Sequence, residues 1–173
     1  RKKPRRPNYI LPKSPNPKKN RAWHRKKVES VIRKGMKKGH SVDKIAKNLH
    51  QVTNMDRVSS YRAVRTGVTS AENEARIDAM YEAEELGIKY ENIWMAVLDA
   101  RTRTSHRVLN GERIPVDEYF SNGLFRPADP DGEPAEVYNC RCTLGGSPEG
   151  VPMEIAEAPA GMGKLEWQGE KPI

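Results

Sequence analysis

The sequence predicts an α+β fold, in which about four N-terminal helices pack with a small sheet and long loops. Apolar residues recur at helical spacing up to about residue 86, whereas residues 93–98 form a continuous apolar run rich in β-forming side chains. Three turn dipeptides, Asn110-Gly111, Asn122-Gly123 and Asp131-Gly132, then divide the chain into short extended pieces. One domain with flanking tails fits the length of 173 residues.

Residues 1–27 are predicted to form an extended basic arm. They contain 12 Lys or Arg and no acid, and five prolines favour a polyproline-like backbone. Like charges repel one another, so this segment cannot fold on itself. The natural counterion of such a block of positive charge is a polyanion, most commonly nucleic acid. Residues 28–173 carry 19 bases against 23 acids, which does not indicate a basic face on the globular part.

We therefore expect the arm to bind double-stranded DNA through its phosphates, without reading sequence. A merely solvated tail is the alternative. The candidate DNA-binding residues are Arg1, Lys2, Lys3, Arg5, Arg6, Lys13, Lys18, Lys19, Arg21, Arg25, Lys26 and Lys27.

The first two helices are predicted from apolar periodicity and from the signals at their ends. Residues 22–38 place apolar side chains on one helical face, and Gly39 supplies a C-terminal stop. Ser41 is expected to cap a short second helix that begins at Val42. The two segments should form a helical hairpin.

Two further helices are predicted before the sheet. One begins near Asn54 or Asp56 and is interrupted around Gly67, because glycine disfavours the interior of a helix. The other spans residues 70–86, and Gly87 follows as its expected C′ residue.

Residues 93–98 are predicted to form a strand that is covered on both faces. This is also the longest uninterrupted apolar run, and it is too short to cross a bilayer, so no membrane partner is expected. Residues 146–173 are rich in Gly, Pro and Glu without periodicity, which indicates a loosely ordered acidic tail. The folded domain is therefore predicted at residues 28–145. Because the chain does not open with Met and lacks a secretion signal, we expect a fragment or processed product that is not exported.

The most informative stretch follows the predicted strand. Asp99 at the end of the predicted strand is followed by Arg101-Thr102-Arg103 with His106, and later by Asn139-Cys140-Arg141-Cys142. Upstream, the pair Arg65-Thr66 is followed by Asn73 and Tyr81. Each motif alone arises easily by chance, whereas four motifs in this order are specific. Their residues are Arg65, Thr66, Trp94, Asp99, Arg101, Thr102, Arg103, His106, Gly111, Asn139, Cys140, Arg141 and Cys142.

This arrangement resembles the phage Mu F-like head morphogenesis family. The family pattern has a strand with Trp and Asp at its end, then Arg-Thr-Arg with a nearby His and Gly, and a terminal Asn-Cys-Arg-Cys. The resemblance covers approximately residues 28–144. The chain departs from the pattern at Gly67, where the family usually has a polar or acidic residue, and at Thr104, where it often has Pro.

Asp99 is expected to lie where the strand ends and backbone donors become free. Its carboxylate can cap the following turn, pair with an arginine, or do both. The candidate partners are Arg65, Arg101, Arg103 and Arg141, and such a pair would fasten a small domain at its loops. The alternative is a phosphate site for DNA made by Arg101, Arg103 and Arg107.

Cys140 and Cys142 are one residue apart, too close for an easy disulfide. Together with His106 they are suited to a soft metal ion, with zinc as the expected ion and Asp99 as a weaker fourth ligand. The alternative is that both thiols pack in the core while His106 bonds to the backbone. The residues leave both interpretations open.

The resemblance implies a minor head protein of a tailed phage that takes part in head morphogenesis and in DNA packaging or ejection. Its expected partners are double-stranded DNA and the portal or major capsid protein. It would reside inside the virion head or near the portal, and in the host cytoplasm during assembly. No enzymatic activity is expected.

Two other functions remain as alternatives. The first is a metal-dependent nuclease or toxin-type effector that uses His106, since some domains of the family are fused to toxin modules. No second histidine lies near the motif, and no Ser-His-Asp or paired-carboxylate pattern is evident. The second is a purely structural shell-cementing protein with no DNA role.

Overall fold

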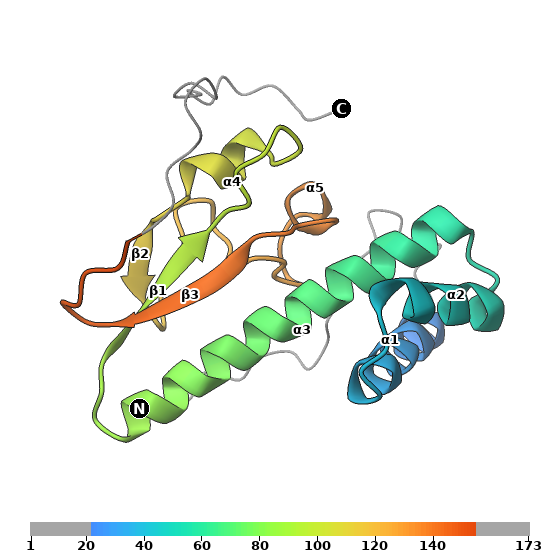
Figure 1. Cartoon of the computed structure of the whole chain (residues 1–173), viewed down its shortest axis with the longest axis horizontal. Coiled ribbons are helices and arrows are strands. Elements are labelled where there is room, and N and C mark those ends of the chain that lie inside the picture. Colours follow the sequence, from blue (N-terminus) through green and yellow to red (C-terminus); the bar gives the residue numbers. More distant parts are fainter. Residues whose placement is uncertain (1–21, 155–173) are drawn as a thin grey trace. The chain divides into compact units, whose positions relative to one another are not determined.

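The computed structural model describes residues 22–154, which fall into two compact units. The helical unit contains the described residues up to Glu72 together with residues 128–140, and the sheet unit contains residues 73–127 and 141–154. Helices and an antiparallel sheet are both present, so the α+β class is confirmed (Figure 1). No described helix is both long and apolar enough to span a membrane.

The helical unit begins with the predicted hairpin of α1 (Ala22–Lys37) and α2 (Val42–Thr53). The chain reverses at Gly39, whose φ of +64° is easily adopted by glycine, and the Ser41 hydroxyl accepts a hydrogen bond from the Lys44 amide at 3.4 Å. Both end signals are therefore confirmed.

Close approach of α1 and α2 depends on Gly35. A Cβ atom at this position would lie only 2.5 Å from Cγ1 of Ile45, which is too close for two non-bonded carbon atoms. The buried side chains of this core come from α1, α2 and the first part of the following helix: Val28, Ile32, Ile45, Ala46, Leu49, Ala63 and Val64.

A single helix, α3 (Arg57–Glu85), replaces the two that the sequence predicts. The predicted interruption around Gly67 is wrong, because one glycine costs a helix only about 1 kcal/mol relative to alanine. Gly67 is buried, and burial of neighbouring turns offsets that cost. The predicted ends are nearly right: the Asp56 carboxylate accepts a hydrogen bond from the Ser59 amide at 2.8 Å, and Gly87 has a φ of +88°.

The sheet unit has three antiparallel strands in the order β2-β1-β3 (Figure 1). Their bounds are Tyr90–Met95 for β1, Arg113–Pro115 for β2 and Thr143–Pro148 for β3. The central strand β1 is thus paired on both sides, with Trp94 opposite Leu144 on β3.

A strand forms in the predicted region, but its bounds differ from the predicted residues 93–98. The structure starts β1 at Tyr90 and ends it at Met95, because its last partner is Thr143, the first residue of β3. Residues 96–98 leave the sheet, and the Ala96 amide bonds instead to the side chain of Asn110 at 3.0 Å. Strand β3 continues to Pro148, so the sheet extends three residues into the predicted tail.

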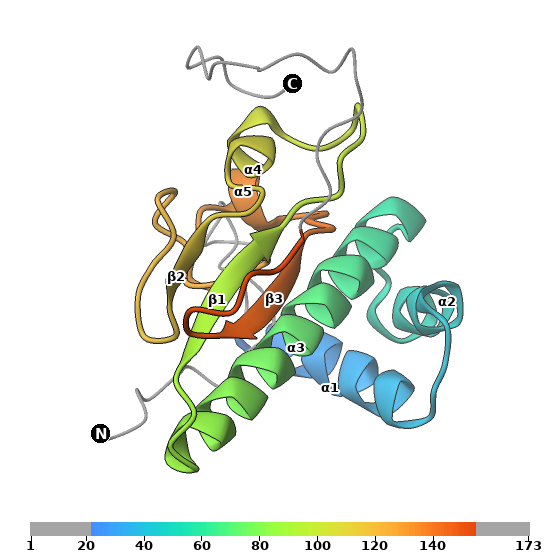
Figure 2. The same ribbon diagram turned by 60° about the vertical axis from the view of Figure 1, so that its left-hand side comes forward.

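The second half of α3 runs along β3 (Figure 2). Gly146 permits this contact, since a Cβ there would collide with the end of the Met80 side chain. Two one-turn helices that the sequence does not predict complete the described chain: α4 (Thr104–Val108) in the sheet unit and α5 (Pro134–Val137) in the helical unit. Periodicity cannot reveal elements of only one turn.

Candidate functional site

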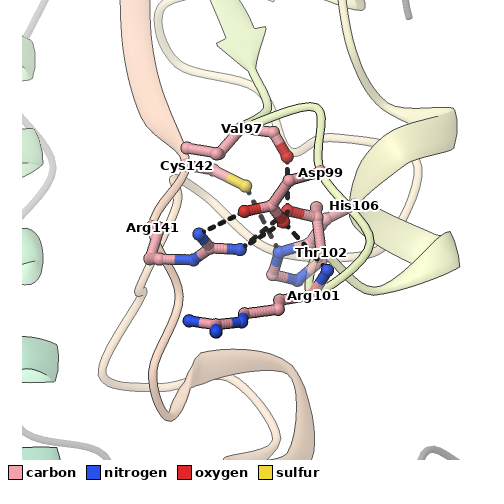
Figure 3. Close-up of polar contacts among 7 residues, drawn as sticks. All are labelled: Val97, Asp99, Arg101, Thr102, His106, Arg141 and Cys142. Atoms are coloured by element: carbon pink, nitrogen blue, oxygen red, sulfur yellow. Dashed lines mark hydrogen bonds and ion pairs between the residues drawn. The ribbon is translucent and has the colours of Figure 1, made fainter. Parts of the chain in front are cut away.

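The centre of the candidate site is an ion pair between Asp99 and Arg141 in the sheet unit (Figure 3). Arg141 Nη1 donates to Asp99 Oδ2 and Arg141 Nη2 donates to Asp99 Oδ1, each at 2.6 Å. The planar guanidinium matches the carboxylate in two-point geometry, which fixes orientation as well as distance. Of the four arginines that the sequence offers as partners, the described structure pairs Asp99 with Arg141.

Asp99 also organises the turn that follows β1. Its Oδ1 accepts hydrogen bonds from the Arg101 amide at 2.9 Å and from the Thr102 hydroxyl at 3.1 Å. The Thr102 hydroxyl donates further to the Val97 carbonyl and accepts from Arg141 at 3.2 Å. The carboxylate therefore caps a turn and pairs with an arginine, although it lies four residues beyond the end of β1 rather than at the strand end itself.

These contacts lower the pKa of Asp99 well below its ordinary range. The hydrogen bonds from Arg141 are the largest cause, desolvation opposes them as the second largest effect, and the hydrogen bonds from the Arg101 amide and from Thr102 lower the pKa further. A carboxylate held in its ionised form by an arginine is a weak base. The chemistry of this group is therefore that of a clamp, not of proton transfer.

Arg101 contributes to the turn through its backbone amide. Its exposed guanidinium lies apart from the Asp99 carboxylate in Figure 3. Arg107 donates to the Thr104 hydroxyl at 3.4 Å within α4.

A second pair of site residues lies beside the clamp. His106 on α4 and Cys142 just before β3 are 1% and 2% exposed, and His106 Nδ1 lies 3.5 Å from Cys142 Sγ. The His106 ring meets the Trp94 indole edge to face, with 5.2 Å between ring centroids. Cys140 is also buried and free of a disulfide, and it is the last residue of the helical unit.

Gly111 joins the loop after α4 to the central strand. Its φ is +86°, its amide donates to the Trp94 carbonyl at 2.8 Å, and the Trp94 amide donates to the carbonyl of Glu112 at 3.0 Å. The motif positions Trp94 and Gly111 are thus joined directly by a main-chain hydrogen bond.

Asn73 holds the Cys-Arg-Cys segment from the side of α3. The buried amide donates to the Cys142 carbonyl at 3.2 Å and to the Pro127 carbonyl at 3.0 Å, and accepts from the Leu144 amide at 2.9 Å. The sequence alone assigns Asn73 no contact. The available signal is an Asn on the face of α3 that also carries Ile77 and Met80, because a buried amide must find partners.

The helical unit joins two other motifs. The buried Thr66 hydroxyl accepts a hydrogen bond from the Asn139 amide at 3.0 Å, and Asn139 adopts a left-handed φ of +57°. Arg65 turns instead to its helical neighbour Tyr61, donating to the phenol oxygen at 2.9 Å. Thr66, and not Arg65, therefore makes the long-range contact of the Arg-Thr pair.

The predicted DNA-binding residues are only partly described. Those from Arg1 to Arg21 lie outside the described residues, whereas Arg25, Lys26 and Lys27 lie on α1. Arg25 pairs with Glu29 one turn later, at 3.2 Å.

The expectation that the globular part has no basic face needs correction. Exposed cations continue along α1 beyond the predicted arm, and Arg33, Lys34 and Lys37 line an open groove together with Lys26 of the arm. Residues 28–72 contain nine Lys or Arg against four acids, while residues 73–173 contain 10 against 19. In the net charge of residues 28–173 the acidic second segment offsets the basic first one.

Comparison with known proteins agrees with the order of the motifs. The family described as phage Mu protein F like protein matches residues 26–145. No solved structure matches the chain.

Two curated relatives are similar to parts of the chain. NAD(+)--arginine ADP-ribosyltransferase EFV of Enterococcus faecalis (strain ATCC 700802 / V583) is 30% identical over 130 residues, which cover 74% of this chain and 27% of that protein. Minor head protein GP7 of Bacillus phage SPP1 is 26% identical over 120 residues, which cover 68% of this chain and 39% of that protein. The chain thus spans well under half the length of either relative.

Proposed function

Since this chain belongs to the phage Mu protein F-like family, we propose that it acts as a minor head protein of a tailed bacteriophage and contacts packaged DNA through its N-terminal positive charge. We further propose that it meets the portal or the major capsid protein, resides in the virion after assembly in the host cytoplasm, and influences DNA packaging or ejection. It acts without catalysis in this proposal.

The distribution of charge carries the DNA part of this proposal. Residues 1–72 contain 21 Lys or Arg and only four acids, and the remaining residues are acidic. On α1 the exposed cations Lys26, Arg33, Lys34 and Lys37 surround one groove, so the positive charge continues from the arm onto a folded surface. A phosphate backbone is the polyanion that best matches such a row of charges.

The contact would be independent of DNA sequence. Lysine and arginine side chains at a basic surface neutralise phosphates and release counterions, which fixes affinity but does not read bases. A protein in contact with packaged DNA must tolerate any sequence, so this property suits the proposed role.

The resemblance to minor head protein GP7 supports a place in the head. The matched segment is 39% of that relative, so it supports the domain's location more directly than the activities of a whole head protein. The portal and the shell are the surfaces that such a component can meet during assembly.

The experiment is a titration of random-sequence duplex DNA with the full chain, followed by gel shift over a range of salt concentrations. Each phosphate contact should contribute about 0.9 to the slope of log affinity against log salt. Deletion of residues 1–21 removes nine cations and leaves α1 intact, and it should lower both affinity and slope strongly.

A matched pair of variants locates the folded part of the surface. Replacing Arg33, Lys34 and Lys37 with Gln removes three exposed charges from the α1 groove, whereas replacing Lys44, Lys47 and Arg57 with Gln removes three exposed charges elsewhere. The first triple should lower the slope by about 2 to 3, and the second should leave it nearly unchanged. Equal effects of the two triples would assign binding to net charge alone, and no binding at low salt would end the DNA proposal.

The ADP-ribosyltransferase relative favours an enzymatic alternative. Its match and that of the minor head protein together exceed the length of this chain, so they share residues, and most of the transferase lies outside its match. The shared segment therefore fits a common, non-catalytic domain. Assays for NAD⁺ consumption and for Mg²⁺-dependent plasmid cleavage, comparing wild type with His106→Ala, should show no His106-dependent activity; such activity would replace the proposal with the effector-type function.

A cementing protein without a DNA role is the other alternative, because the same cations can grip an acidic protein surface. Binding of the full chain to empty heads and to DNA should be compared at the same moderate salt. Binding to empty heads alone would favour the cementing role.

A further inference from the structure

We propose that the segment from Arg101 to Arg107, in the sheet unit, binds phosphate groups of the DNA backbone as a second contact, separate from the N-terminal arm and α1. This assignment rests on the proposed function, since the ligand is the same packaged DNA. The described residues of the sheet unit contain eight Lys or Arg against 12 acids, so the unit as a whole is acidic. Residues 100–111 nevertheless contain three arginines and no acid.

Most other bases of the sheet unit are already neutralised by an acid. The ion pairs are Lys89 with Glu149, Arg113 with Glu91, Arg126 with Glu74 and Arg141 with Asp99. By contrast, Arg101 and Arg107 form no ion pair with a described residue. Their charge is therefore available to an anion from outside the chain.

Arg101 combines a fixed backbone with an unused side chain. Its amide donates to Asp99 Oδ1 at 2.9 Å, and the next residue, Thr102, is 8% exposed and bonds to the same carboxylate. The guanidinium is exposed, bonds to no described residue, and lies apart from the Asp99 carboxylate in Figure 3. A firmly anchored residue that offers five N–H donors suits the paired oxygens of a phosphate.

Arg107 and Arg103 add charge one turn further along the chain. The Arg107 amide donates to the Arg103 carbonyl at 3.0 Å, so the two side chains start from neighbouring positions on one helical turn. Arg107 Nη2 also donates to the Thr104 hydroxyl at 3.4 Å, which restrains the guanidinium on α4. Arginine and hydroxyl side chains of this kind commonly contact phosphates.

A nucleic acid fits this segment better than an acidic protein does. Three arginines within seven residues repel one another, and their ligand must supply several closely spaced negative charges. Duplex DNA carries one negative charge per about 1.7 Å of helix axis, whatever its sequence. The three arginines can therefore meet phosphates without any requirement for a particular base sequence.

The first test compares two double variants of the full chain in the salt titration of random-sequence duplex DNA. Arg101→Gln with Arg107→Gln should lower the slope of log affinity against log salt by about 2, since each phosphate contact contributes about 0.9. Arg76→Gln with Lys89→Gln removes the same charge from exposed positions of the same unit and should change the slope by less than about 0.5. If Arg107→Gln impaired folding, Arg101→Gln alone would still decide, because its exposed guanidinium holds no described residue, and the expected loss is about 1.

The second test locates the DNA by cross-linking. A photoactivatable group on Val108→Cys, a 60% exposed position next to Arg107, should cross-link to bound DNA. Leu86→Cys, at an 82% exposed position, should not, because Leu86 precedes β1 and Arg101 follows it, at the two ends of the central strand (Figure 1). The wild-type chain gives the background, since both of its own cysteines are buried.

The outcomes separate this contact from the proposed function. Wild-type binding to DNA, with equal slopes for the two double variants and no cross-link from Val108→Cys, would overturn the second contact and leave the proposed function standing. If Arg101→Gln weakened binding to empty heads but not to DNA, the segment would bind an acidic protein surface, and this proposal would be wrong. No DNA binding by wild type at low salt would end the proposed function and this contact together.

Discussion

Arg141 grips Asp99 with two hydrogen bonds of 2.6 Å, joining the segment before β3 to the turn that follows β1. The two residues are 42 positions apart in sequence. Because the turn also depends on Asp99 for the Arg101 amide and the Thr102 hydroxyl, this contact organises the loops of the sheet unit. Its sensitivity to pH and to the geometry of the cation can be measured.

Asp99→Asn should remove a pH-dependent part of the stability. The Arg141 hydrogen bonds lower the folded-state pKa of Asp99, so its stabilisation is complete above the unfolded pKa of about 3.9 and is lost as pH falls toward the folded pKa. The denaturation midpoints of wild type and variant should therefore differ by a constant amount above about pH 5 and converge below about pH 4. Urea denaturation across this range measures the difference, and a gap that does not narrow in acid would contradict the account.

Arg141→Lys should destabilise the chain although charge is kept. A lysine presents a point charge and cannot reproduce the two-point contact with both Asp99 oxygens. Arg101→Lys is the matched control, because the exposed Arg101 side chain lies apart from the carboxylate and only its backbone amide bonds to Asp99. In thermal denaturation the midpoint of Arg141→Lys should be clearly lower than that of wild type. The midpoint of Arg101→Lys should be within error of wild type.

Asn73→Ala should cost about 2–3 kcal/mol of unfolding free energy. The substitution leaves the carbonyls of Pro127 and Cys142 and the amide of Leu144 without the amide that bonds them in the interior. Glu72→Ala, one residue earlier on the exposed face of α3, should change stability by less than about 0.5 kcal/mol. If urea denaturation gave the two variants equal stability, Asn73 would not hold the Cys-Arg-Cys segment.

Glu74→Gln should destabilise the folded chain more than the partial exposure of the Glu74 side chain suggests. Arg126, with a side chain only 5% exposed, donates to Glu74 Oε2 through Nε at 2.7 Å and through Nη2 at 2.6 Å. Removing the carboxylate charge from a buried guanidinium costs about 3 kcal/mol, whereas Glu74→Gln combined with Arg126→Met should recover part of the loss. A double-mutant cycle measures this coupling, and strictly additive losses would show that the pair is not coupled.

Gly146→Ala should cost about 1–3 kcal/mol through overpacking. The added methyl group meets the end of the Met80 side chain and would lie 2.9 Å from its Sδ, so the buried Met80 side chain must move aside. In a Met80→Ala background the same substitution should be nearly neutral. An equal cost in both backgrounds would indicate a backbone effect of Gly146 that does not involve Met80.

Local signals predicted the helix ends and the central strand because each depends on a few neighbouring residues. Gly39, Ser41 and Gly87 act where the sequence places them, since capping and left-handed turns are short-range effects. The interruption at Gly67 and the strand bounds 93–98 failed because tertiary packing and strand pairing decide them.

The site shows the same division. Sequence reasoning named Asp99 and Arg141 among several pairings, but it could not select one, because their contact spans 42 positions and depends on the β1–β3 register. The roles of Asn73 and Arg126 were missed for the same reason: their partners become neighbours only after folding. The cations along the α1 groove do not show in the net charge of residues 28–173, because acids outnumber bases after position 72.

Electron cryo-microscopy of DNA-filled heads assembled with the full chain tests the proposed function most directly. The account predicts density for this chain inside the head or beside the portal, with the α1 surface carrying Arg33, Lys34 and Lys37 turned toward DNA. Heads that assemble without the chain, or a chain bound with that surface turned away from DNA and toward protein, would contradict it.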